Sequence, residues 1–394
     1  MKNLTLSTCV LLLATLVNCT CNTSIKIYEH PSYSSDSGIV REYTFEKQVE
    51  KLPSNTNASS KIVREIQSAF SKCARTILAV HALDTKSVSD VRILSSSTFL
   101  TEASYYRKDV SYLHLWSTNS QATTLSSTFS IPIAAHKLGV LNKDTLAAIR
   151  HSDQHTVTIF TKGKNTQSIS LKPELEPYFL DFADDSTLIG VYNKIERLPG
   201  GYKDSGTITV YAWNLAGREL SKLSWKHHTA RNATISRDRE KIAIAYNASD
   251  HNSWIMLYNT CTYGFNILPV PDGNSVTQSL AFNPQRNLLA LTTDNKELFI
   301  VDLNTSLFAD AIHLPREYRW MTFSPDSKEI ALATAVFENG KTTKAVLSFL
   351  NIASKKICSI ELPAQWINLY GRIFQYLPNG HFVFVYDNHI IVGK

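Results

Sequence analysis

Short runs of apolar and β-branched residues, each followed by a polar turn, fill the chain from about residue 88 to its end. The clearest unit contains four such runs, which cover residues 318–323, 329–334, 345–351 and 356–362. The turn after the first run reads Ser-Pro-Asp-Ser-Lys, and these are typical turn residues. Because the runs are short and no long helical period accompanies them, the pattern predicts an all-β fold.

The unit recurs, and the end of its third run gives the register of each copy. A large apolar residue there precedes a short polar one, at Trp116-Ser117, Phe160-Thr161, Trp213-Asn214, Tyr258-Asn259, Val301-Asp302 and Leu350-Asn351. Successive copies lie 44, 53, 45, 43 and 49 residues apart, close to the roughly 40 to 45 residues of a four-stranded propeller blade. These units resemble WD40 repeats, a β-propeller family whose third strand often ends in Trp-Asp. Bacterial propellers with YVTN-type or TolB-like repeats are similar at this level.

Seven units fit into the chain, near residues 88–127, 128–172, 173–225, 226–269, 270–313, 314–363 and 364–394. The last unit ends at its third run, around Ile390–Val392, and therefore has no outer strand of its own. An unpaired strand edge is costly and prone to aggregation. Residues 76–83 form a β-compatible run just before the first unit. We therefore predict a seven-bladed β-propeller of four-stranded antiparallel blades, closed by residues 76–83 pairing with the C-terminal blade.

The N-terminus has the pattern of a secretory signal over residues 1–18. Lys2 precedes an apolar run at 4–17, which at about 1.5 Å per residue is shorter than the roughly 30 Å core of a membrane. The following Leu16-Val17-Asn18-Cys19 resembles a bacterial lipobox, which implies a lipid on Cys19; ordinary cleavage near Cys19 is the alternative. We expect an exported protein that is periplasmic, membrane-anchored or extracellular.

Residues 19–60 are predicted to form a tether or loop because of their composition. Residues 61–74 are predicted to form a short amphipathic helix, and residues 75–394 the propeller. One face of the helix carries Ile62, Ile66, Phe70 and Cys73. We expect this face to pack on the rim of the propeller; docking of a partner is the alternative.

The cysteines of the chain show no disulfide framework and no CxxC motif, so we expect dispersed free thiols. Cys261 and Cys358 fall in blades that are separated by a whole blade. Because disulfide-bonded cysteines have Cα atoms within about 7 Å of each other, we predict no disulfide between these two.

Composition excludes several classes of protein. With 43% hydrophobic residues, 19% charged residues, 14 Gly and 13 Pro, the chain is not collagen-like or wholly disordered. The 40 Lys and Arg exceed the 34 Asp and Glu by only six, so the charge does not suggest a nucleic-acid partner.

Searching the sequence for catalytic or metal-binding patterns yields only weak candidates. There is no H-E-x-x-H, no G-x-S-x-G and no P-loop. Adjacent histidines on a strand point to opposite faces, which makes His227 and His228 a poor metal site. His151 and His155 flank a turn where two imidazoles could hold a metal, but we expect them to be solvated. Asp181, Asp184 and Asp185 cluster around one turn and could bind a cation or raise the pKa of one carboxyl, but we expect them to bond backbone N–H groups. Residues 237–241 form a charged turn that we expect to be solvated. We therefore predict no catalytic, cofactor-binding or metal-binding residue, and no cofactor.

Resemblance to WD40 repeats implies a non-enzymatic scaffold that binds a protein or peptide with its loops. The alternative is a propeller enzyme, such as a lactonase-like or other hydrolase, with its site at the mouth of the central channel. We expect a monomer, held to a membrane only if Cys19 carries a lipid.

Overall fold

The chain divides into two compact units, residues 1–41 and 42–394, and every residue described below belongs to the second. The computed structural model describes residues 56–394 except 58–59, 83–86, 105–110, 120–124, 133–134, 143, 151–154, 162–165, 173–174, 195–196, 199–200, 203–205, 227, 249–251, 272–274, 339–340, 364–372 and 387–388. The predicted signal, Cys19 and most of the predicted tether lie outside the described residues. In the described part, no helix is long and apolar enough to cross a membrane.

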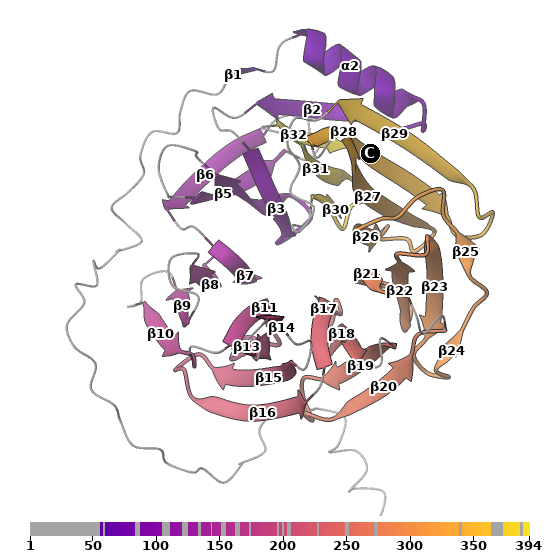
Figure 1. The fold of residues 1–394 in the computed structure, drawn as a ribbon. Coiled ribbons are helices and arrows are strands. Elements are labelled where there is room, and N and C mark those ends of the chain that lie inside the picture. Colours follow the sequence, from indigo (N-terminus) through magenta and orange to yellow (C-terminus); the bar gives the residue numbers. More distant parts are fainter. Residues whose placement is uncertain are drawn as a thin grey trace, which may run out of the picture. The chain divides into compact units, whose positions relative to one another are not determined.

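Seven antiparallel sheets form the blades of a propeller, as predicted (Figure 1). Blade 1 contains β3 (Ser87–Ile93), β4 (Thr98–Ser104), β5 (Ser111–Thr118) and β6 (Leu125–Pro132). Blade 2 contains β7 (Ala135–Asn142), β8 (Thr145–Arg150), β9 (Thr156–Thr161) and β10 (Gln167–Ser170). Blade 3 contains β11 (Leu175–Phe182), β12 (Thr187–Lys194), β15 (Thr207–Asn214) and β16 (Glu219–Lys226).

The next three blades continue the same meander. Blade 4 contains β17 (His228–Ile235), β18 (Lys241–Ala248), β19 (Ser253–Asn259) and β20 (Phe265–Pro269). Blade 5 contains β21 (Thr277–Phe282), β22 (Leu288–Thr293), β23 (Glu297–Asp302) and an interrupted outer strand, β24 (Leu307–Phe308) and β25 (Ile312–His313). Blade 6 contains β26 (Trp320–Phe323), β27 (Glu329–Glu338), β28 (Lys341–Asn351) and β29 (Ile357–Pro363). A separate hairpin, β13 (Arg197–Leu198) and β14 (Gly201–Tyr202), is inserted between β12 and β15.

Both ends of the chain contribute to blade 7, as predicted. Its sheet has the order β1 (Thr56–Asn57), β2 (Ile77–Ala82), β32 (His389–Gly393), β31 (Phe382–Tyr386) and β30 (Phe374–Tyr376). β2 pairs antiparallel with β32, with Val80 opposite Ile391. Thr76 and Lys394 extend the ladder with two reciprocal backbone hydrogen bonds of 2.9 Å. The prediction that the segment near residue 80 supplies the missing strand is therefore confirmed, and β1 adds a fifth strand that the sequence did not suggest.

One predicted boundary was wrong. The first repeat was expected to end at residue 127, but β6 continues to Pro132 and pairs with β5 along most of its length. The outer strand of a blade is only partly buried, so its hydrophobic pattern marks its end poorly.

Helix α2 (Ser60–Ser71) lies in the segment that was predicted to be helical and packs on the rim at blades 6 and 7. Ile66 and Phe70 are fully buried, and the Phe70 ring stacks on Phe382 at 5.6 Å between ring centroids. Phe382 stacks in turn on Phe374 of the innermost strand at 5.1 Å. A continuous aromatic core therefore joins the helix to the inside of blade 7.

The expectation of dispersed free thiols was wrong for two cysteines. Cys73, just after α2, forms a disulfide with Cys358 of β29 across 285 residues of sequence, with the Cα atoms 5.7 Å apart. Because a link over this distance depends on how the helix sits on the rim, no local spacing could reveal it. Cys261 is a free thiol, so the prediction that it does not bond to Cys358 is confirmed.

Buried histidines lie next to the seam that closes the ring. The imidazole of His81 on β2 contacts the Trp116 ring of blade 1 edge-on at 5.2 Å, and His114 lies 5.9 Å from the same ring. Trp116 itself donates to the Thr101 hydroxyl at 2.8 Å. Burial lowers the pKa of His81, and it lowers the pKa of His114 to about 4. Both side chains are therefore neutral in the folded protein at pH 7.

We predict that the free energy of unfolding falls as the pH drops from 6.5 towards 4, because unfolded His114 takes up a proton that the folded protein excludes. A pKa lowered from 6.5 to about 4 corresponds to about 3 kcal/mol at the acidic limit. Urea unfolding at pH 7.5 and pH 5 measures this loss. The variant His114→Gln should lose less stability on acidification than the wild type, whereas the exposed His313→Gln should behave as the wild type. Equal losses in all three proteins would contradict the assignment.

Candidate functional site

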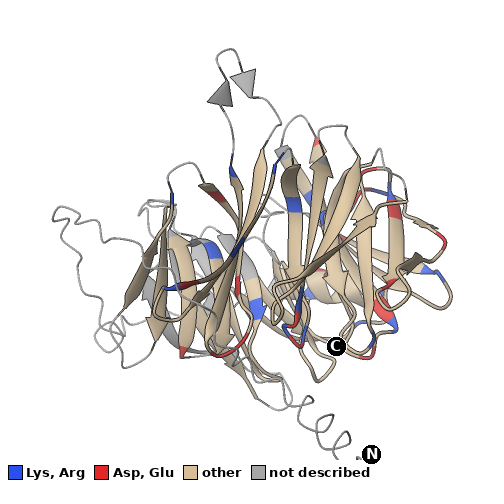
Figure 2. Ribbon diagram, turned by 90° about the horizontal axis from the view of Figure 1, so that it is seen from below, with Lys and Arg blue, Asp and Glu red and all other residues tan. Residues whose placement is uncertain are grey.

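Each innermost strand runs between the two ends of the ring, which Figure 2 shows edge-on. We call the end where the innermost strands begin the bulge end, because six of these strands contain a β-bulge there. The other end, where each innermost strand turns into the second strand of its blade, is called the turn end. The C-terminus, which pairs with Thr76, lies at the turn end.

At the bulge end, the innermost strands of blades 1 to 5 each contain one residue more than the paired second strand. The extra positions are Asp90, His136, Tyr178, Arg231 and Gln278. In blade 6, the N–H of Arg319 donates to the carbonyl of Ala333, which also pairs with Trp320, so Arg319 occupies the same place. A β-bulge turns a side chain out of the regular alternation. Six innermost strands thus carry a bulge at the same end of the ring.

Side chains are described for four of these bulge residues, and all four are accessible. Arg231 is exposed, while Tyr178, Gln278 and Arg319 are half-buried. The ammonium of Lys137 lies 5.5 Å from the centre of the Tyr178 ring, a cation–π distance. Arg319 pairs with the Glu317 carboxylate at 3.4 Å, with more than a third of each side chain exposed. This end therefore offers guanidinium donors, an amide and an aromatic ring to a ligand.

Neighbouring blades hold two of the bulges in place. Asn193 on β12 makes two hydrogen bonds to the backbone of Ala230, accepting from its N–H at 2.9 Å and donating to its carbonyl at 3.2 Å. The hydroxyl of Thr292 on β22 donates to the carbonyl of Tyr318 at 3.0 Å. Both partners are buried and bond the residue just before a bulge. The positions of Arg231 and Arg319 are therefore fixed by the scaffold rather than by the side chains themselves.

Extensions of two blades enlarge the bulge end. The hairpin β13–β14 occupies the connection between the second and third strands of blade 3. In blade 6, β27 and β28 pair over ten and eleven residues, well beyond the four-residue innermost strand β26. Phe337, near the tip of this longer hairpin, is 54% exposed. An exposed aromatic residue of this kind is a common anchor for a bound partner.

Several polar side chains at the turn end connect blades, and others form hydrogen bonds within their own turn. Arg239, in the first turn of blade 4, donates to the carbonyls of Phe182 in blade 3 at 3.2 Å and Val140 in blade 2 at 3.0 Å. Further bonds between neighbouring blades run from Lys241 to Asn287, from Gln285 to the Pro325 carbonyl, from Ser327 to Asn283 and from Asn379 to the Ser96 carbonyl. The expectation that residues 237–241 form a solvated turn was therefore wrong for Arg239 and Lys241.

The three aspartates of blade 3 do not converge on one point. Asp181 is buried, accepts from the N–H of Phe182 at 2.9 Å and pairs with Arg92 of blade 1 at 3.5 Å. Asp184 accepts from the N–H and the hydroxyl of Ser186, both at 2.7 Å, which is the turn chemistry expected from the sequence. Asp185 is exposed.

The ion pair between Arg92 of blade 1 and Asp181 of blade 3 crosses blade 2. Gly139 of blade 2 lies so close to β11 that a Cβ atom there would meet the Asp181 Cα at 3.0 Å. Glycine therefore allows blade 2 to sit against blade 3, and Arg92 of blade 1 reaches past it. Asp181 is thus a structural residue that joins blades 1 and 3.

The candidate histidines are not brought together either. His228 packs on the Tyr246 ring at 4.9 Å and His155 is exposed, while His227 and His151 lie outside the described residues. In the part of the chain that the structure describes, no three His, Cys, Asp or Glu side chains are grouped so that they could hold a metal ion.

Sequence reasoning missed the bulge residues. A bulge changes the register by one residue and leaves no composition signal. One positional signal was available: Tyr178, Arg231, Gln278 and Arg319 each lie four residues before the apolar residue that ends the first run, at Phe182, Ile235, Phe282 and Phe323. A polar or aromatic side chain in the same place of four units indicates a shared role.

Comparison with solved structures shows a WD40-like fold. A structure described as "Crystal structure of WD40 beta propeller domain of Doa1" superposes with a TM-score of 0.56 at 14% sequence identity, covering 81% of this chain and 96% of that chain. The predicted WD40-like propeller is thereby confirmed at the level of fold. No protein-family model and no curated protein sequence matches the chain.

We predict that Arg239→Ala lowers the free energy of unfolding by about 2 to 3 kcal/mol, because hydrogen bonds from a charged group are lost and carbonyls of two blades lose their donor. The neighbouring Arg237 is exposed, so Arg237→Ala serves as the matched control. Urea unfolding of both variants measures the difference. If both variants were as stable as the wild type, Arg239 would not join the blades.

Proposed function

We propose that this protein is an exported, non-enzymatic scaffold that binds a protein or peptide segment at the bulge end of its ring. The observation that carries the proposal is the backbone bulge that the innermost strands of six blades share at the same end of the ring. The WD40 propeller fold commonly serves as such a scaffold.

The two ends of the ring favour this assignment of the binding face. At the turn end, Arg239 and Gln285 use their side chains to bond neighbouring blades. At the bulge end, Arg231 is exposed and Phe337 presents an aromatic ring to solvent. A segment of another chain could pair its carbonyl or carboxylate oxygens with the guanidinium groups and its apolar side chains with Phe337.

The bulge residues whose side chains are described suit binding, whereas the other two, Asp90 and His136, are residue types that a hydrolase could use. The four whose side chains are described are a tyrosine, two arginines and a glutamine. Hydrolysis requires a positioned base, most often a histidine or carboxylate. Asp181, the buried carboxylate of blade 3, is paired with Arg92. These groups are suited to hydrogen bonding and charge recognition.

Export is favoured by the disulfide as well as by the N-terminal apolar run. The Cys73–Cys358 bond joins segments 285 residues apart, and disulfides persist mainly in oxidising compartments. The sequence around Cys19 suggests how the exported chain would be held to a membrane, through a lipid on that residue.

Charge reversal at the bulge end should abolish partner binding. We predict that the double variant R231E/R319E loses the proteins that the wild type captures from an extract of its host, because both guanidinium groups are replaced by carboxylates. The matched control is R237E/R286E, which makes the same charge change at exposed positions of the turn end. It should capture what the wild type captures, as measured by quantitative mass spectrometry. Capture that is unaffected by R231E/R319E, or reduced equally by both variants, would refute the assignment of the binding face.

Export and anchoring are tested by intact-mass measurement of protein purified from the membrane fraction. We predict a mature chain that begins at Cys19 and carries the mass of a diacylglycerol, and release of the Cys19→Ala variant from the membrane. Cleavage near residue 19 without the added lipid mass would support export but contradict the lipid anchor on Cys19. A chain that retains residues 1–18 would contradict export.

A further inference from the structure

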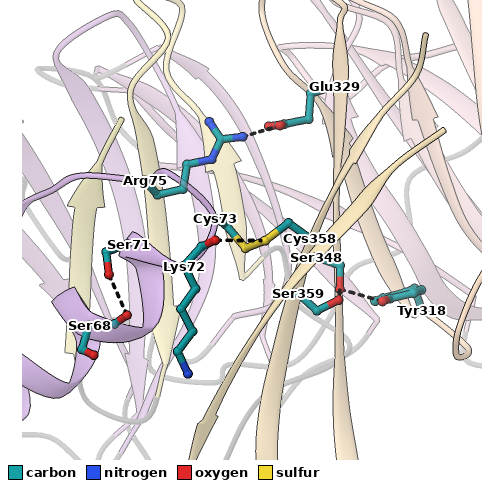
Figure 3. The surroundings of a disulfide bond; sticks show 10 residues. All are labelled: Ser68, Ser71, Lys72, Cys73, Arg75, Tyr318, Glu329, Ser348, Cys358 and Ser359. Atoms are coloured by element: carbon teal, nitrogen blue, oxygen red, sulfur yellow. Dashed lines mark hydrogen bonds and ion pairs between the residues drawn. A yellow bond between two sulfur atoms is a disulfide. The ribbon is translucent and has the colours of Figure 1, made fainter. Parts of the chain in front are cut away.

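Three residues between positions 73 and 76 attach the N-terminal segment to the ring in three different ways, two of which Figure 3 shows. Cys73 is bonded covalently to Cys358 on the outer strand of blade 6. Arg75 forms an ion pair with Glu329 of the same blade, and its guanidinium lies 4.3 Å from the centre of the Phe349 ring. Thr76 forms the two backbone hydrogen bonds with Lys394 that begin the β2–β32 ladder. The disulfide therefore sits three residues from the point where the ring closes.

Glu329 extends this attachment to the inside of blade 7. It accepts a hydrogen bond from the Tyr376 hydroxyl as well as the ion pair from Arg75. Burial, together with the neighbouring Glu329 carboxylate, raises the pKa of Tyr376, so the hydroxyl keeps its proton and remains the donor. Blades 6 and 7 and the N-terminal segment thus meet at one carboxylate.

Non-covalent contacts would keep the segment in place without the disulfide. Ile66 and Phe70 remain buried against Phe382 and Phe384, and β2 keeps its pairing with β32. Loss of the covalent bond would therefore leave the folded ring as the ground state. Without the disulfide, the free energy needed to detach residues 60–82 is lower, because a segment no longer linked at Cys73 gains more conformational entropy when it detaches.

The disulfide can be reached by a reductant. Both cysteines are only partly buried, on the rim between α2 and β29, and the Sγ of Cys358 lies 3.6 Å from the carbonyl of Lys72 at an exposed position. Accessible disulfides are the ones that dithiols reduce, whereas fully buried ones are protected.

We propose that the Cys73–Cys358 disulfide is a redox latch on ring closure. In its reduction a dithiol donates two electrons and two protons, the S–S bond breaks, two thiols form, and the dithiol becomes a disulfide. Residues 60–82 then leave β32 more often and expose the edge of that strand, including the fully buried Ile390 and Val392. In an oxidising compartment the disulfide keeps β2 paired with β32, and in a reducing one this pairing opens more often. This effect does not depend on what the bulge end binds.

Hydrogen exchange of the full-length protein tests the latch. In the oxidised protein, amides of residues 77–82 and 389–393 should exchange slowly, and treatment with a dithiol should speed their exchange by about tenfold or more. Amides of β18 in blade 4, far along the chain from the seam, should accelerate much less. Thiol labelling followed by mass spectrometry confirms that the disulfide has been reduced.

Two variants separate the latch from a general effect of the reductant. Cys358→Ser should show the fast seam exchange without dithiol and no further change with it. Cys261→Ser removes the free thiol and should behave as the wild type in both conditions. Seam exchange that is equal in the oxidised and reduced proteins would overturn the latch. So would acceleration in β18 as large as that at the seam, because β18 should exchange mainly without opening of the seam while the ring stays closed most of the time.

Discussion

The propeller depends on one pairing, that of β2 with β32, because every other blade strand pairs with strands close to it in sequence. Blade 7 would otherwise end at β32 with an unpaired edge of apolar residues, which is a costly feature of any sheet. The chain satisfies this edge with residues from its other end, 307 or more positions away in sequence, as the pairing of Ala82 with His389 shows. Helix α2, the disulfide and Arg75 all act on this one junction.

The two ends of the closed ring differ in structure. Hydrogen bonds between blades are concentrated at the turn end, where Arg239 spans three blades. The bulges are at the other end, where Asn193 and Thr292 fix the backbone before Arg231 and Arg319. Six innermost strands share a bulge at one end of a frame braced between blades, and under the proposed function little conformational freedom would be lost when a partner binds.

The fold was largely predictable from the sequence because a repeated hydrophobic pattern reports directly on strand spacing, and the apolar run at 76–83 had no other place in the repeat. The link between Cys73 and Cys358 was not predictable, since it depends on where α2 sits on the rim. The bulge residues were missed for a related reason: a shift of one residue in register is set by pairing between strands. Arg239 looked like part of a solvated charged turn because its acceptors are backbone carbonyls, which have no sequence signature.

Removal of residues 389–394 tests the closure most directly, with hydrogen exchange measured in blades that do not contain them. If the β2–β32 pairing holds the whole ring, this deletion should reduce protection not only in β31 but also in β12 and β18 of blades 3 and 4, together with a loss of cooperative urea unfolding. Protection in β12 and β18 that matches the full chain, with changes confined to blade 7, would show that the blades stand without the closure and would contradict the account.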